Sequence, residues 1–460
     1  MRNTHKLTTI AVLVMSLSAC AVGPDYQAPA KVADINVSSP YQQAELTQSW
    51  WQAFDDESLN RLIQRALNEN RTLAQARANV DRAYAVFQDA DNDILPKGTL
   101  DAGYQASENA VLQPENESAI IRGYSTGANL SWDLDLFGKL RRASEAAEAQ
   151  AQQADILWHD AQVQLISQVA TSYGEYRGAQ LRLQVAEQNL QNLQQSRAIV
   201  MARLEAGMAS ELELAQIDVQ LHQVNASIPA YRVVLLTADA TLSALLAQRP
   251  GHLGLDAEPH LPQLKQPVAI VEGENYLRYR ADVASSERLL AARTAEVGVA
   301  TADLYPNVSI SGFLGFLSGP GLSLGSDTKS WSVAPSLSWQ AADLGSVRSR
   351  IRQAEASSQM ALAEFEQQVF NAINEMQLAL NSYNLSREQQ LSTELQWQAS
   401  NKAVDISREL YNAGTGEFLA LLDSERELLR SRDQLAQLQQ QSFLRLVNIY
   451  RSFGGGIQLI

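Results

Sequence analysis

The sequence is poor in the residues that build disulfide frameworks and metal centres. It has one cysteine, Cys20, and five histidines among 460 residues, so no disulfide can form within the chain. The histidines are scattered, and none has the spacing of a metal-ligand pair such as H-x-x-x-H. Neither a G-x-x-x-x-G-K-[ST] phosphate loop nor a G-x-S-x-G elbow occurs. We therefore expect no catalytic residues, no metal, no cofactor and no enzymatic activity.

Basic charge and long hydrophobic runs are also scarce. The formal net charge of −15 argues against nucleic acid as a partner. Beyond the first residues, no stretch contains the roughly eighteen consecutive apolar residues expected of a membrane-spanning helix. Any crossing of a membrane would therefore have to be made by strands that close into a barrel.

Residues 1–19 have the composition of a bacterial lipoprotein signal peptide. A basic start is followed by a short apolar run, residues 7–17, that is too short to span a bilayer. The run ends in Leu17-Ser18-Ala19-Cys20, which predicts cleavage before Cys20 and attachment of lipid (palmitate) to this cysteine. An ordinary secretory signal that contains a cysteine is the alternative. Residues 20–49 are then expected to form an extended, lipid-anchored segment.

The chain is a tandem duplication. The sequence Leu130-Ser131-Trp132 recurs as Leu337-Ser338-Trp339, and Ala206-Gly207 recurs as Ala413-Gly414, both 207 residues later. We place the first repeat at 50–250 and the second at 268–453. Prolines and glycines mark a linker at 251–267, and residues 454–460 form a glycine-rich tail.

Each repeat contains a long helical hairpin. Residues 139–206 contain no proline, and residues 346–413 contain neither proline nor glycine. Apolar residues in the second stretch recur every three or four positions, which predicts one continuous helix face. Such a helix would extend about 100 Å and would be stable only when packed lengthwise against others. Each stretch ends at Ala-Gly, and helical sequence then resumes, so we expect hairpins at 139–248 and 346–453.

Strands are expected at about 98–107, 124–136, 307–317 and 331–341. Their side chains alternate between apolar and polar, as in a transmembrane barrel with one face toward lipid and one toward water. The residues expected to face lipid are Leu130, Trp132, Leu337 and Trp339. Those expected to face the lumen are Ser131, Asp133, Ser338 and Gln340. A soluble two-sheet sandwich is the alternative.

Four strands are too few to close a membrane barrel, which needs about eight. Because an open strand edge cannot exist in lipid, the chain is expected to close its barrel as a dimer of eight strands or a trimer of twelve. The predicted fold class is a membrane α+β protein, in which the barrel is continued by a second tube of long coiled-coil hairpins.

Three blocks of sequence resemble one family. They are Cys20-Ala-Val-Gly23-Pro24-Asp25-Tyr26, Trp50-Trp51, and Tyr450-Arg-Ser-Phe453-Gly454-Gly455-Gly456. They are similar to lipoproteins of the outer membrane factor family, the TolC-like exit ducts, in its NodT-type branch. The resemblance implies a homotrimer with a twelve-stranded barrel in the outer membrane and a twelve-helix α-barrel in the periplasm.

The resemblance also implies a function. Such a duct would be the passive outer-membrane channel of a tripartite efflux system, transporting drugs and other small toxic solutes and contributing to multidrug resistance. A periplasmic adaptor (membrane fusion protein) and an inner-membrane pump would be its partners. Export of proteins, or a structural spacer role in the periplasm, are the alternatives. The lipidated start resembles drug-efflux members, and a spacer has no use for strands with a polar face.

The family's periplasmic gate matches the second hairpin tip. By resemblance, Tyr411 is a gate tyrosine, Asp423 belongs to a ring of aspartates at the narrowest point, and Leu419 forms a second constriction. Two positions depart from the pattern of some members: Gly416 replaces an arginine, and Ala420 replaces an aspartate. An ordinary amphipathic helix with a solvated carboxylate is the alternative reading of Leu419 and Asp423.

Overall fold

A computed structural model describes residues 21–28, 42–43, 49–108, 120–255, 260–264, 269–270, 279–319 and 325–456. Cys20, the expected lipidation site, lies outside these residues. The chain divides into two compact units. Unit 1 comprises Met1–Ala30, Asn79–Asp155 and Ser285–Gln367, and unit 2 comprises Lys31–Ala78, Ile156–Ala284 and Gln368–Ile460.

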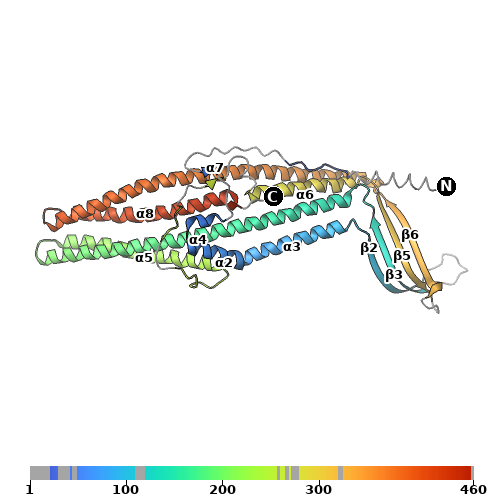
Figure 1. Ribbon diagram of the computed structural model, residues 1–460, viewed down its shortest axis with the longest axis horizontal. Coiled ribbons are helices and arrows are strands. Elements are labelled where there is room, and N and C mark those ends of the chain that lie inside the picture. Colours follow the sequence, from blue (N-terminus) through green and yellow to red (C-terminus); the bar gives the residue numbers. More distant parts are fainter. Residues whose placement is uncertain are drawn as a thin grey trace. The chain divides into compact units, whose positions relative to one another are not determined.

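Unit 1 contains a four-stranded antiparallel sheet with the order β2-β3-β5-β6 (Figure 1). Its strands are β2 (Lys97–Glu108), β3 (Ile120–Asp133), β5 (Asn307–Ser318) and β6 (Lys329–Ser338). Each repeat therefore supplies one hairpin, and β3 pairs with β5 to join the two. The strand β6 ends earlier than the sequence suggests, because a short 3₁₀ helix, η4 (Ala341–Asp343), begins after Gln340.

The helical part of unit 1 is packed with small residues. It includes most of α3 (Arg71–Asn92) and α6 (Ala281–Ala302), together with the first turns of α4 (Lys139–Glu205) and α7 (Leu344–Asn412). Ala149 of α4 packs against Ala291 and Ala292 of α6. The N-terminal segment lies on the same helices: Val22 N donates to Phe137 O at 3.2 Å, and a Cβ at Gly23 would lie 2.5 Å from Gly298 Cα.

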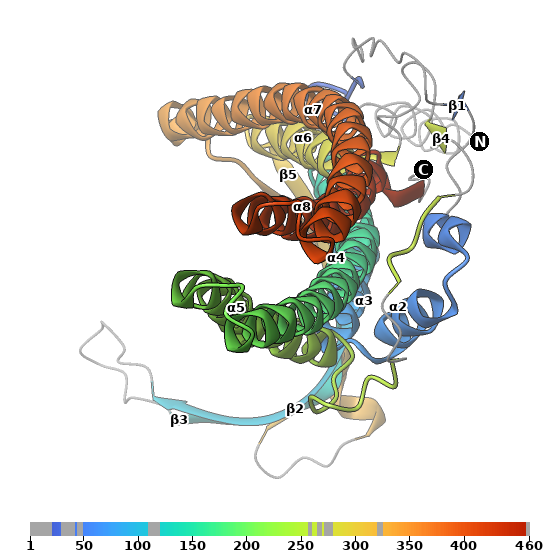
Figure 2. The same ribbon diagram turned by 90° about the vertical axis from the view of Figure 1, so that its left-hand side faces the viewer.

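Unit 2 is built from two helical hairpins. The remainder of α4 runs beside α5 (Glu211–Leu245), and the remainder of α7 runs beside α8 (Phe418–Ser452), as Figure 2 shows. Smaller elements complete it: η1 (Trp50–Phe54), α2 (Glu57–Glu69), the strand pair β1 (Gln42–Gln43) and β4 (Ala269–Ile270), and η5 (Gly454–Gly456). The rings of Trp50 and Tyr450 stack with centroids 4.6 Å apart.

Two glycines let α4 and α8 approach each other closely. A Cβ at Gly174 would lie 2.5 Å from Phe443 Cδ1, and one at Gly178 would lie 2.4 Å from the Gln440 side-chain amide. Since real Cβ atoms do not come this close to other heavy atoms, a side chain at Gly174 would displace the buried Phe443 ring, whereas one at Gly178 would displace only the flexible end of Gln440. The two repeats are thus joined in unit 2 by backbone-to-side-chain packing.

One helix departs from the expectation that no helix is apolar enough to span a membrane. Among the described residues, α5 meets the requirement by length and composition, with a mean hydropathy of 1.2 over its best window, of which 22% is buried. Arg232 and Asp239 interrupt its apolar run, which is why a search for uninterrupted apolar residues does not find it. Length and composition alone are weak evidence for a membrane span.

Candidate gate and barrel surfaces

The strand register sorts the sheet into two faces, because directly paired residues lie on the same face. Leu130 pairs with Gly98 and Gly312, Trp132 pairs with Ile310, and Leu337 pairs with Val308. The face that holds these residues is predominantly apolar along all four strands. Its large side chains are Leu100, Tyr104, Tyr124, Leu130, Trp132, Ile310, Leu314, Phe316, Trp331, Val333 and Leu337.

The apolar face is exposed in the single chain. The exposed fractions of Leu130 and Leu337 are 46% and 66%, which is unusual for neighbouring large apolar side chains on a water-soluble surface. The opposite face is mostly polar and includes Ser131, Asp133 and Ser338. The hydroxyls of Ser309 and Ser336 lie 2.8 Å apart there. One face therefore suits lipid and the other suits water.

Three of the predicted barrel residues lie at strand ends. Trp132 Nε1 and Trp339 Nε1 each donate a hydrogen bond of 3.0 Å, to Ile94 O and Leu304 O respectively. Gln340 follows the end of β6 and is not part of the strand. Its Oε1 accepts a hydrogen bond of 3.0 Å from Arg350 Nη2, so Gln340 belongs to the junction between strand and helix rather than to the strand's polar row.

The two hairpin tips turn in the same way. Gly207 has φ +73° and Gly414 has φ +76°, a backbone conformation that glycine adopts without strain. Gly207 N donates to Leu204 O at 2.9 Å, and Gly414 N donates to Tyr411 O at 3.0 Å. The predicted gate residues lie on both sides of the second tip.

Tyr411 is buried between the two hairpins, with an exposed fraction of 4%. Its hydroxyl donates to Glu213 Oε2 of α5 at 3.2 Å. Arg203 of α4 lies over its ring at 4.2 Å and donates to its carbonyl oxygen at 2.6 Å. Burial, and then the charge of Glu213, raises the pKa of Tyr411. The hydroxyl is therefore neutral at physiological pH and acts as a donor to the carboxylate.

An apolar cluster supports these contacts. It joins all four long helices of unit 2 and consists of Leu193, Val200, Ile217, Tyr411, Phe418, Leu421 and Leu422. Because Tyr411 belongs to this cluster, any movement of the α7–α8 tip relative to α4 and α5 would disturb buried apolar packing.

Leu419 and Asp423 lie on the exposed side of α8. Leu419 is 54% exposed, and the Asp423 carboxylate pairs with Arg426 of the next helical turn at 3.2 Å. They are four residues apart, so they share one face of the helix. The structure thus separates the predicted gate residues: Tyr411 faces the interior of the chain, whereas Leu419 and Asp423 face outward.

The departure at Gly416 has a steric cause. A Cβ at this position would lie 2.9 Å from Leu410 Cβ and from Tyr411 N, and Gly416 N donates to Leu410 O at 2.9 Å. No side chain fits at this point of the turn. The arginine that the family resemblance suggests for this position would not fit into this turn.

Further contacts beside the tip tie α8 to α4, α5 and α7. Glu425 accepts hydrogen bonds from Ser196 Oγ at 2.7 Å and from Arg408 Nη2 at 3.2 Å. When its amide is turned so that the oxygen faces α8, Gln220 of α5 accepts bonds of 2.6 and 2.8 Å from Arg426. Arg426 therefore connects the outward-facing Asp423 with the first-repeat hairpin.

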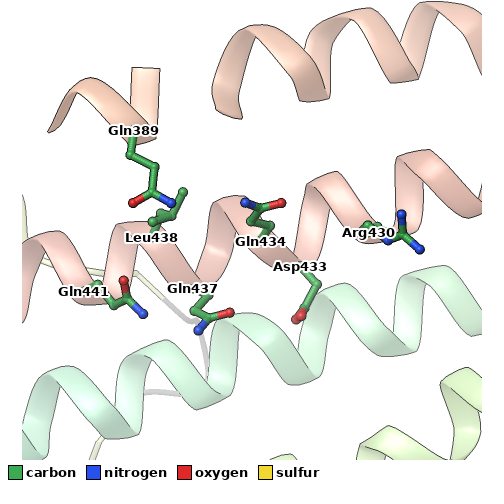
Figure 3. Close-up of a pocket in the computed structure, with 7 residues that line it drawn as sticks. All are labelled: Gln389, Arg430, Asp433, Gln434, Gln437, Leu438 and Gln441. Carbon is green, nitrogen blue, oxygen red and sulfur yellow. The ribbon is translucent and has the colours of Figure 1, made fainter. Parts of the chain in front are cut away.

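A polar pocket of about 370 Å³ lies between α7 and α8. Figure 3 shows its lining residues, Gln389, Arg430, Asp433, Gln434, Gln437, Leu438 and Gln441. Asp433 pairs with Arg182 of α4 through bonds of 2.9 and 2.8 Å, which raise the pKa of the guanidinium. The pocket offers amide donors and acceptors but no nucleophile beside a base, so it is a polar part of the helical wall.

Sequence reasoning did not find Arg203, Glu213 or Arg426. Each of them contacts a residue about two hundred positions away (Arg203 and Glu213 contact Tyr411, and Arg426 contacts Gln220). A local sequence pattern cannot reveal such contacts. Glu213 is the counterpart of Ala420 at the repeat distance of 207 residues, so the duplication provides one signal that could have indicated an acidic residue near the tip. Within the described residues, no cluster of three or more histidine, cysteine or acidic side chains could hold a metal ion.

Comparison with known proteins gives consistent results. The model of the outer membrane efflux protein family matches residues 62–248 and 274–455. The cation efflux system protein CusC of Escherichia coli K12 is 28% identical, with 96% of this chain and 98% of that protein covered. Outer membrane protein OprJ of Pseudomonas aeruginosa is 28% identical, with 97% and 95% covered. The solved structure of the outer-membrane channel OprN superposes with a TM-score of 0.91 at 39% identity, covering 95% of this chain and 99% of that chain.

Proposed function

The chain belongs to the outer membrane efflux protein family, and we propose that it is the duct through which a tripartite system discharges drugs and other small toxic solutes. The fold is that of the family's trimeric channels, with four antiparallel strands and long helices in each chain. The channel lies in the outer membrane and extends into the periplasm. Its partners are two further copies of the chain, a periplasmic adaptor and an inner-membrane pump.

One observation carries the proposal: the sheet has an exposed apolar face, a polar face and two edge strands, β2 and β6. In a bilayer the edges must be paired, because unpaired backbone groups have no water to bind there. Three copies supply twelve strands and close the edges. The polar faces then line a water-filled passage, with Ser131, Asp133 and Ser338 toward the lumen and Leu130 and Leu337 toward lipid. Trp132 and Trp339 would lie at the membrane interface.

The second hairpin tip is the proposed periplasmic gate. In a trimer, three copies of Leu419 would form an apolar collar, and three copies of Asp423 would form an acidic ring. Tyr411, on the buried side of the tip, would hold the tip closed through its contacts with Glu213 and Arg203. This arrangement assigns the constriction to the exposed side of α8 and the latch to the buried end of α7.

Family members are channels rather than enzymes, and we propose that this chain likewise catalyses no reaction. The pump would supply all the energy for transport. The lipid on Cys20 would anchor the start of the mature chain, and the contacts of Val22 and Gly23 with Phe137 and Gly298 would hold that anchor beside unit 1.

The test is a conductance measurement on purified trimers in planar bilayers. We expect discrete channel openings, and expression of the protein with its adaptor and pump should restore drug resistance to an efflux-deficient strain. A structural spacer would give stable trimers without any conductance. Resistance that stays absent while a protein substrate reaches the medium would indicate protein export instead.

A further inference from the structure

The apolar face of the sheet carries two cations at the end farthest from the helices. Arg122 of β3 and Lys329 of β6 are both exposed, and register places them on the same face as Leu130 and Leu337. They are the charged residues among the described side chains of this face, and both are basic. This is notable because the chain as a whole has a net charge of −15. By strand register, position 108 at the end of β2, a glutamate, belongs to the same face.

The two cations are equivalent positions of the duplication. They lie 207 residues apart, as do Trp132 and Trp339, so each cation precedes its tryptophan by ten residues. An aromatic residue, Tyr124 or Trp331, follows each cation two positions later on the same face. Both halves of the chain therefore repeat one arrangement: a cation, an aromatic ring, an apolar stretch and a tryptophan.

The spacing matches the thickness of a membrane. Ten residues of strand extend about 34 Å, and a strand tilted by about 45° crosses roughly 24 Å, close to the apolar band of an outer-membrane barrel. The chain continues from the tryptophan end into α4 and α7, which belong to the periplasmic side. Arg122 and Lys329 therefore lie at the outer surface of the membrane.

We propose that Arg122 and Lys329 bind the phosphate groups of the phosphorylated glycolipid of the outer leaflet, lipopolysaccharide, with Tyr124 and Trp331 packed against its sugar and acyl groups. This inference depends on the lipid-facing assignment proposed above. Arginine binds phosphate through two parallel hydrogen bonds, and lysine binds it as a point charge. A trimer would present six such cations in a ring around the barrel.

The experiment uses full-length trimers in detergent and adds purified lipopolysaccharide. The readouts are the temperature of trimer dissociation and the phosphate retained by each trimer after washing. For the wild type, both should rise with added lipopolysaccharide. Arg122→Gln and Lys329→Gln should each weaken binding about fivefold, the factor expected for one basic residue near an anionic surface, and the double variant should lose about twenty-fivefold if the sites act independently.

Two further variants change other charges of the sheet. Lys97→Gln removes a cation from the polar face at the opposite end and should leave binding unchanged. Glu108→Gln removes a negative charge that lies, by register, on the same face as Arg122, so it should strengthen rather than weaken the binding of lipopolysaccharide. The charge-conserving variants Arg122→Lys and Lys329→Arg should also retain binding, which guards against a loss caused by misfolding alone.

Equal binding by wild type and the double variant would overturn the proposal. So would equal stabilisation by phosphatidylglycerol, because the site would then bind anionic lipid without preference for the glycolipid; phosphatidylcholine should have no effect. Conductance of the same samples separates this inference from the proposed function. A double variant that conducts normally but binds no lipopolysaccharide supports both, whereas a wild type that does not conduct contradicts the duct itself.

Discussion

The indole nitrogen of Trp339 donates a hydrogen bond of 3.0 Å to the carbonyl oxygen of Leu304. This bond joins the chain just after β6 to the turn between α6 and β5. The first repeat contains the same bond between Trp132 and Ile94, also at 3.0 Å. Each sheet hairpin is thus fastened to the helix that precedes it, at the point where the proposed membrane region ends.

Replacing Trp339 by phenylalanine should weaken this junction. The variant keeps an apolar ring but loses the donor, at an expected cost of about 1 kcal/mol. A lower dissociation temperature of the trimer would reveal the loss. Trp331→Phe is the matched control, since it changes the same residue type on the same face at the far end of β6. Equal effects of both variants would contradict a specific role for the bond.

Charge on the apolar face should be poorly tolerated. Leu130→Arg or Leu337→Arg places a cation toward lipid, at a cost of about 2–4 kcal/mol near the centre of the membrane. Ser131→Arg and Ser338→Arg, one residue away on the polar face, should assemble normally and narrow the channel. The measurement is the fraction of heat-resistant oligomer on a gel. The reverse order of sensitivity would mean that the two faces are assigned the wrong way round.

The proposed acidic ring should bind cations at the periplasmic end. Converging carboxylates repel one another and attract counter-ions, so a trivalent cation on that side should block the current. Asp423→Asn should abolish the block, and Leu419→Ala should raise conductance by widening the collar. If neither substitution alters conductance or block, the gate lies elsewhere, and Leu212 and Gln216 at the first tip are the next positions to test.

The buried latch should restrain opening. Tyr411→Phe removes the donor to Glu213 while keeping the ring in the apolar cluster, so the tip should open more readily and single-channel conductance should increase. Glu213→Gln should have a similar effect. Because both changes break the same hydrogen bond, the double variant should conduct no more than the stronger single variant. Additive increases would show that the two residues act separately.

Asp160 should make stability depend on pH. Burial, and then the charge of Asp282, raises the pKa of this α4 carboxyl, against the lowering effects of Gln164, Arg280 and Arg451. A raised pKa in the folded state means that stability falls as pH rises from the ordinary carboxyl pKa through the folded one. Asp160→Asn should therefore raise the melting temperature more near pH 8 than at about pH 4. An equal gain in melting temperature at both pH values would show that the raised pKa of Asp160 is not the cause.

Periodicity explains which parts of the molecule the sequence could predict. Alternation along 124–132 and 331–339 identified the strands and their two faces, and the spacing of apolar residues identified both helical hairpins. The resemblance to a family predicted the trimer, which the related channels support; its assignment of the gate to the second tip remains a prediction. Local patterns could not locate the end of β6 at Ser338, because the 3₁₀ turn after Gln340 interrupts an alternation that continues in the sequence. Nor could they reveal that Arg203 and Glu213 enclose Tyr411, since that contact depends on how two distant hairpins pack.

The close approach of α4 to α8 also bears on the history of the duplication. Gly174 makes room for Phe443. In the second repeat, the counterpart of Gly174 is Asn381, and the counterpart of Gly178 is Leu385, which is 64% exposed. The halves are therefore no longer interchangeable parts. A second copy of the first hairpin in place of α7 and α8 would put Leu236 where Phe443 now fills the groove above Gly174. The two halves now fit each other at this contact. A bulkier residue at position 174 would therefore require a smaller residue at position 443 in the same protein.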